Sequence, residues 1–157
     1  MDDARFEDAA ERPVRLLARD EDDLQVIAAL TQDAVFPASE MTWDRRQRRF
    51  GVLLNRFRWE DAQKPARRKR PFERVQSVLV IEDATRVVTQ GVDPRERDVV
   101  LSLLDIGFEP AAEGAGRVVM TLAGDGALGV DVEALEVKLK DVTRPYIAPS
   151  KKRPSHD

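Results

Sequence analysis

The chain contains no cysteine, and its one histidine, His156, is the penultimate residue. Without cysteine it cannot form a disulfide, use a thiolate nucleophile or bind zinc or an iron–sulfur cluster through sulfur, and it suits a reducing compartment. His156 lies in a charged, proline-containing segment, where we do not expect the positioned imidazole that acid–base catalysis or metal binding needs. We therefore predict no metal site and no cofactor.

Long apolar runs are also missing. The longest, residues 78–81 and 99–104, fall far short of the roughly 20 residues that span a bilayer. Residues 1–13 are acidic and have no apolar core, so a signal peptide is not expected. With a sequence pI of about 5.4, these features predict a soluble cytoplasmic protein with no membrane partner.

No catalytic motif is present. The five serines have no histidine to activate them and none lies in a G-x-S-x-G turn. Gly124-Asp125-Gly126 resembles a hairpin turn, because no lysine-bearing helix start follows it as a phosphate site would require. The 29 acidic residues offer no pair that the sequence singles out. We therefore predict no catalytic residue and favour a non-enzymatic role over an unrecognised enzyme.

Apolar periodicity predicts an α+β fold. Leu24, Ile27 and Leu30 recur at helical spacing, which predicts an amphipathic helix over residues 21–35. The acidic run before it, Asp20 to Asp23, is better explained by helix capping than by metal binding, because consecutive carboxylates fan around a helix start. Alternating patterns after residue 40 predict six or seven mostly antiparallel strands, without the intervening helices of a parallel sheet.

The sequence indicates the ends of this domain less clearly than its centre. Residues 133–142 fit either a strand or a helix, and their good helix formers favour a C-terminal helix. We predict a flexible acidic N-terminus over residues 1–12, one globular domain over 13–143 and a flexible tail rich in proline and lysine over 144–157.

A basic segment, residues 44–74, is the most distinctive part of the chain. It holds twelve Lys or Arg and four Asp or Glu residues, a net charge of +8, whereas the chain as a whole carries −3. A local positive field of this kind attracts acidic groups even on an acidic protein. We therefore predict that this surface binds a partner, which is an acidic protein or, alternatively, RNA or DNA.

Five arginines of this segment are the candidate anion- or partner-binding residues: Arg56, Arg58, Arg67, Arg68 and Arg70. In a strand over residues 50–59, Arg56, Arg58 and Glu60 share one face, and Asn55, Phe57 and Trp59 the other. An exposed face would make Arg56 and Arg58 a two-pronged anion site, since Arg binds carboxylate or phosphate in a bidentate manner. The alternative is ion pairing to Asp or Glu on neighbouring strands, which we favour.

Nucleic-acid binding would also need exposed aromatic residues on which bases stack. Residues 49–53, Arg-Phe-Gly-Val-Leu, are similar to part of the central motif of RNA-recognition domains. The preceding glycine and the second and third aromatic residues of that motif are absent, so the stacking surface is not predicted.

Several segments together resemble one protein family. They are residues 18–24 (ARDEDDL), 30–35 (LTQDAV), 49–60 (RFGVLLNRFRWE), 101–108 (LSLLDIGF) and 131–136 (DVEALE). The chain is similar, over roughly residues 14–145, to a family of small bacterial cytoplasmic proteins known only as a domain of unknown function. The resemblance implies a small soluble protein with no assigned activity, cofactor or catalytic residue.

Overall fold

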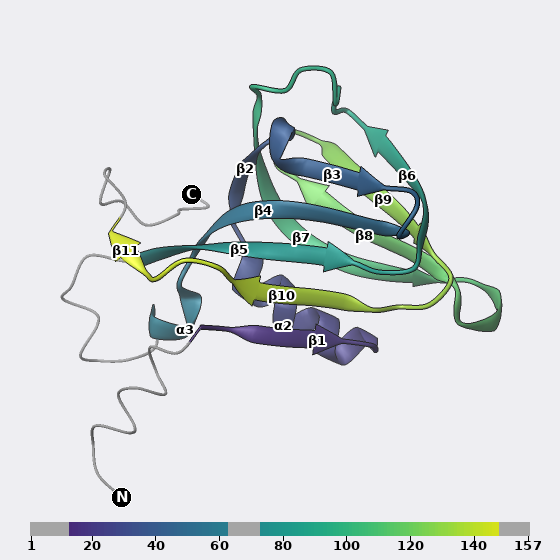
Figure 1. The fold of residues 1–157 in the computed structure, drawn as a ribbon, viewed down its shortest axis with the longest axis horizontal. Helices are drawn as coiled ribbons and strands as arrows, with labels where there is room; N and C mark the ends of the chain where they lie inside the picture. Colours follow the sequence, from purple (N-terminus) through teal and green to yellow (C-terminus); the bar gives the residue numbers. More distant parts are fainter. Residues whose placement is uncertain (1–12, 63–72, 148–157) are drawn as a thin grey trace, which may run out of the picture.

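A computed structural model describes residues 13–62 and 73–147, apart from the side chains of residues 61, 62 and 147 (Figure 1). Every strand pair within these ranges is antiparallel. The elements are β1 (Arg15–Ala18), α2 (Glu21–Thr31), β2 (Val35–Pro37), η1 (Ala38–Glu40), β3 (Met41–Asp44), β4 (Arg49–Phe57), α3 (Trp59–Ala62), β5 (Glu73–Ile81), β6 (Ala84–Gln90), β7 (Val100–Pro110), η3 (Ala112–Gly114), β8 (Gly116–Leu122), β9 (Gly126–Val132), β10 (Val137–Asp141) and β11 (Tyr146–Ile147).

The predicted α+β fold with six or seven strands is wrong. The described residues form one eleven-stranded sheet in the order β1-β10-β5-β4-β2-β7-β8-β9-β6, with β3 added to β4 and β11 to β5. The short strands β2 and β11 were not predicted, since two or three residues are too few to carry an alternating pattern. The protein is therefore mainly an antiparallel β structure with a helix packed against it.

The predicted C-terminal helix is also wrong, because residues 137–141 form β10. Val137, Leu139 and Asp141 are buried, whereas Lys138 and Lys140 are exposed. β10 pairs with β1 on one side and β5 on the other, and this pairing outweighs the helix propensity of the lysines.

The helix α2 starts where the acidic run predicts and ends four residues earlier than predicted. The Asp20 carboxylate accepts a hydrogen bond from the Asp23 N–H at 2.8 Å, which confirms the capping interpretation. The helix stops at Thr31 because Gln32 has a non-helical ψ of 132°, and Asp33, with a left-handed φ of 64°, then directs the chain into β2.

The domain boundaries extend slightly beyond the predicted ones. β11 lies in the segment predicted as a tail and pairs with the start of β5, so the sheet continues to Ile147. The predicted flexible N-terminus, residues 1–12, and residues 148–157 of the tail predicted over 144–157 lie outside the described residues.

The sheet folds over so that its two halves enclose the core. Leu54 and Leu79 from one half and Met120 and Val130 from the other belong to the same buried cluster. On one side of the fold, α2 covers the opening between β1 and β7, with Leu24 and other apolar side chains buried (Figure 1). In the described ranges no helix is long and apolar enough to cross a lipid bilayer.

On the other side no helix or strand of the described residues covers the space between β3 and β6. Within these residues β6 is the last strand of the sheet and β3 pairs with β4 alone, so each has an edge to which no described strand is paired. The two strands meet at the β3–β4 turn, where the Ala84 N–H donates to the Arg48 carbonyl at 2.9 Å. From there β6 runs away from β3, and residues 91–99 connect it to β7 above the gap (Figure 1).

Candidate functional site

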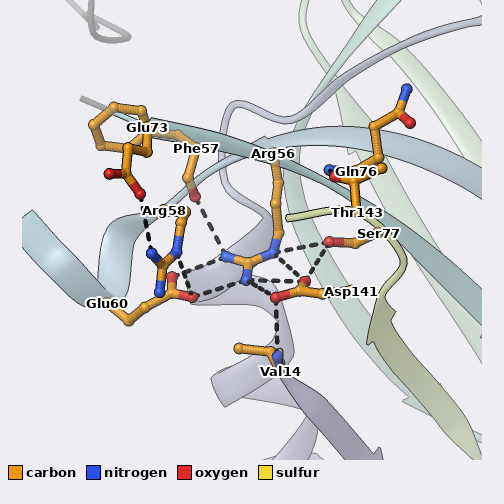
Figure 2. A network of polar contacts seen from close by, with 10 residues as sticks. All are labelled: Val14, Arg56, Phe57, Arg58, Glu60, Glu73, Gln76, Ser77, Asp141 and Thr143. Atoms are coloured by element: carbon orange, nitrogen blue, oxygen red, sulfur yellow. Dashed lines mark hydrogen bonds and ion pairs between the residues drawn. The ribbon is translucent and has the colours of Figure 1, made fainter. Parts of the chain in front are cut away.

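The side chain of Arg56, one of the five predicted binding residues, lies inside the protein (Figure 2). It projects from β4 and is 0% exposed. Its guanidinium donates to both Asp141 oxygens at 3.0 Å and to the two Glu60 oxygens at 2.9 and 2.8 Å. Its Nε also donates to the Ser77 hydroxyl at 3.0 Å. The arginine is thus surrounded by protein acceptors.

Asp141 is the second centre of this network. Its carboxylate also accepts hydrogen bonds from the Ser77 hydroxyl at 2.6 Å and from the Val14 backbone N–H at 2.9 Å. The Asp141 backbone N–H in turn donates to the Val14 carbonyl at 2.9 Å. The Arg56 cluster, defined as Val14, Arg56, Glu60, Ser77 and Asp141, therefore joins β4, β5, β10, α3 and the chain that enters β1 (Figure 2).

The charges of the Arg56 cluster stabilise one another. Burial alone lowers the pKa of Arg56, but the hydrogen bonds and charges of Glu60 and Asp141 outweigh it and raise this pKa above its ordinary value. Burial alone raises the pKa of Glu60, but the hydrogen bonds and charge of Arg56 dominate and hold it below its ordinary value. Arg56 and Glu60 are therefore both charged at neutral pH.

Arg58 is placed similarly, with 2% of its side chain exposed. Its guanidinium donates to a Glu73 carboxylate oxygen at 3.1 Å, and its Nε lies 3.7 Å from a Glu60 oxygen. A hollow of about 450 Å³ is lined by Arg58 together with Glu73, Asp141, Arg144 and neighbouring residues. Arg56 and Arg58 thus form ion pairs within the protein, the arrangement favoured over a two-pronged exposed site.

The remaining predicted binding residues, Arg67, Arg68 and Arg70, lie outside the described residues. The described ends that flank them, Ala62 and Glu73, are near the end of β4 that carries Phe57. The β3–β4 turn, with Arg45 to Arg48, is at the other end of this nine-residue strand, about 27 Å away. The described part of the basic segment therefore lies at both ends of β4.

The aromatic residues of the segment are mostly used for packing. β4 ends at Phe57, so Trp59 and Glu60 lie on α3 instead of continuing the strand. The Trp59 indole donates to the Gln32 carbonyl at 2.8 Å, and its ring meets that of Phe57 edge-on with centroids 4.6 Å apart. Phe50 is 3% exposed and offers no stacking surface.

Trp43 differs, because it lines two adjoining hollows between β3 and β6. The first, of about 550 Å³, lies at the β3–β4 turn and is lined by residues that include Trp43, Arg45, Arg48, Arg86, Val87 and Glu133. The second, of about 310 Å³, shares Trp43 and Val87 and adds Met41, Phe50, Thr89, Arg97 and Leu128. We call the two together the β3–β6 groove.

The β3–β4 turn sets the cationic end of this groove. The Asp44 carboxylate accepts the Gln47 N–H at 3.1 Å, and Arg48 takes a left-handed φ of 58°, which is uncommon for a residue other than glycine. The Arg48 guanidinium donates to both Glu133 oxygens at 3.1 Å. These bonds fix the turn against β6 and the segment after β9.

Two cations of the first hollow are not neutralised in this way. Arg45 and Arg86 form no ion pair with any residue in the described ranges, although Arg86 contributes, behind Arg117, to a lowered pKa of Asp131. Both arginine residues are exposed. Beside a half-buried tryptophan, two such guanidinium groups can take up a carboxylate or a phosphate.

Sequence reasoning did not find this site. Arg45, Arg48 and Trp43 belong to or adjoin the predicted basic segment, but Arg86, Val87 and Glu133 come from regions far along the chain. Only the antiparallel pairing of β6 with β9 and its contact with the β3–β4 turn bring them together. The sequence carries no local signal of that convergence.

The comparisons with known proteins place the chain in a family. Residues 14–156 match the model of the family described as "Protein of unknown function (DUF2948)". The chain belongs to this family. No curated protein and no solved structure matches it. In the part of the chain that the structure describes, no three His, Cys, Asp or Glu side chains are grouped to hold a metal ion.

Replacing Arg56 by methionine is predicted to destabilise the fold by about 3–5 kcal/mol, because the buried Asp141 loses its cation and Glu60 keeps only the more distant Arg58. Adding Asp141→Asn to this variant should recover part of the loss. The control Arg49→Met breaks a half-exposed pair with Glu82 and should cost less than about 1 kcal/mol. Urea unfolding measures all three, with Arg56→Lys as a milder variant. Equal losses for Arg56→Met and Arg49→Met would contradict this role.

The Arg56 cluster also predicts a dependence of stability on pH. Because the pKa of Glu60 is lowered by folding, its contribution is complete above the unfolded-state pKa of about 4.3 and is lost as pH falls through the folded-state pKa. Glu60→Gln should cost about 1–3 kcal/mol at neutral pH, and the difference from the unmodified chain should shrink in acid. Unfolding curves at several pH values measure it, with the exposed Glu96→Gln as control. A difference that stays constant with pH would rule out this linkage.

Proposed function

We propose that this protein is a non-enzymatic cytoplasmic interaction domain that binds an acidic partner protein through the β3–β6 groove. The observation that carries the proposal is the convergence of Arg45, Arg48 and Arg86 on one hollow of about 550 Å³ beside Trp43. Glu133 is the one acidic residue among those that line it, and it is paired with Arg48. An anionic group entering the hollow therefore meets two cations without an ion-pair partner in the described ranges.

The residues that line the groove favour a protein partner. Beyond the arginines the lining becomes apolar, with Met41, Phe50 and Leu128 beneath Trp43 and Val87. A partner that carries both carboxylates and apolar side chains can use both parts. Mixed polar and apolar lining of this kind, with aromatic and arginine anchors, is typical of protein interaction sites.

Nucleic acid is the alternative partner of the basic segment. It would be favoured by one continuous cationic band carrying exposed aromatic residues. The burial of Phe50 and Phe57, which removes two of the aromatic residues on which bases could stack, weighs against that alternative. We therefore base the proposal on an acidic protein segment.

The proposal predicts that Arg45→Ala/Arg86→Ala weakens binding of an acidic probe at least about tenfold, or ~1.4 kcal/mol. The probe is a short fluorescein-labelled peptide of alternating glutamate and valine, and fluorescence anisotropy measures its binding. The control variant Arg15→Ala/Arg95→Ala removes the same charge from exposed arginines outside the groove. It should bind almost as tightly as the unmodified chain, and all binding should weaken in high salt.

Trp43 gives an independent readout of the same binding. The chain has two tryptophans, so a Trp59→Phe background leaves Trp43 as the only indole and makes its fluorescence report on the groove. Equal losses in the two double-alanine variants, or a Trp43 signal that the bound peptide does not change, would refute the groove as the site. Tighter binding of a single-stranded oligonucleotide of equal charge would favour the nucleic-acid alternative.

A further inference from the structure

The edge of β6 that faces the groove is free along most of its length. β6 pairs with β9 on one side and is the terminal strand of the sheet. The register is regular from Arg86 to Gln90, and the irregularity lies before it, between Ala84 and Arg86. Beyond Ala84, no backbone hydrogen bond joins this strand to any described residue other than those of β9. Alternate residues of this five-residue stretch thus offer backbone donors and acceptors that have no partner in the described residues, since the others bond to β9.

The other terminal strand, β1, is protected in ways that β6 is not. It has four residues, and α2 packs against it. Short length and a covering helix are common means by which proteins block the edges of sheets. The exposed part of β6 is longer, carries Val87, Val88 and Thr89, and adjoins a groove instead of a helix.

The groove also matches the alternation of side chains along an extended chain. Val87 and Thr89 point to its lining, with Phe50 (3% exposed) and Leu128 (1% exposed) behind them. A segment paired with β6 would place every second side chain toward this apolar lining. Arg45 and Arg86 stand at one end of the groove and Arg97 at the other, so acidic residues at the ends of the segment would meet cations.

We infer that the acidic partner binds as an extended peptide segment that adds a strand to the free edge of β6, with alternate apolar side chains in the groove. This inference rests on the proposed function and names the form of its partner. Backbone hydrogen bonds to β6 supply affinity, while the groove and its arginines select apolar and acidic side chains.

The experiment compares three peptides of the same alternating glutamate and valine sequence, of which the first is unmodified. The second carries N-methyl groups on alternate residues, on the edge that would pair with β6, which removes backbone donors and leaves the charge unchanged. The third, N-methylated on the opposite edge, is the matched control. Loss of two or more hydrogen bonds should weaken binding about tenfold for one edge and far less for the other.

Hydrogen exchange locates the added strand. On binding of the unmodified peptide, amides within residues 86–90 should become protected, whereas those of the other terminal strand, residues 15–18, should not change. Protection of both strands alike, or of neither, would overturn strand addition. So would protection of residues 86–90 in the peptide-free protein at high concentration together with a dimeric mass, since the occupant would then be a second copy of the chain.

The outcomes separate the two proposals. If all three peptides bind equally and Arg45→Ala/Arg86→Ala still weakens them, recognition of an acidic partner stands and strand addition is wrong. If no peptide binds, or the single-stranded oligonucleotide alone does, the proposed function fails together with the inference. Edge-specific loss of binding with protection of residues 86–90 supports both.

Discussion

The buried ion pair between Arg56 and Asp141 is the interaction on which the rest of the structure depends. Removing a guanidinium from water costs several kcal/mol, and two carboxylates, a hydroxyl and excellent geometry offset this cost. Such a pair adds little net stability relative to apolar residues, but it strongly disfavours arrangements that separate its members. In this protein it ties β4 to β10 across β5 and holds α3 and the chain before β1. It therefore fixes how one half of the folded sheet is assembled.

The ion pairs of Arg56 and Arg58 limit where an anionic partner can bind. Arg56 and Arg58 are committed to carboxylates of the protein, so the cations open to a partner in the described ranges must come from elsewhere. The folded sheet has two openings, and α2 fills the one beside β1 with apolar side chains. The opening between β3 and β6 has no such helix, and it is there that Arg45 and Arg86 flank Trp43. The fold thus leaves an uncovered strand edge and unpaired cations at the same place.

The sequence predicted local features better than their assembly. The cap at Asp20 and the long alternating strands β4, β5 and β7 could be read from it, because each depends on neighbouring residues. β10 could not, since its lysines favour a helix and its strand form depends on pairing with β1 and β5. The burial of Arg56 depends on Asp141, 85 residues away, and the groove depends on Arg86 meeting the β3–β4 turn. Contacts between residues so far apart cannot be predicted from the local sequence pattern of either segment.

The most direct test of this account is an NMR titration of the isotope-labelled protein with the alternating glutamate–valine peptide, following each backbone amide. The account predicts that the largest shift changes fall on residues 41–48 and 84–90, the two sides of the β3–β6 groove. Amides around Arg56 and Asp141 should stay unchanged, because that cluster holds the fold and faces no partner. Changes concentrated at Glu73 and residues 143–145, beside the hollow next to Arg58, would contradict the account.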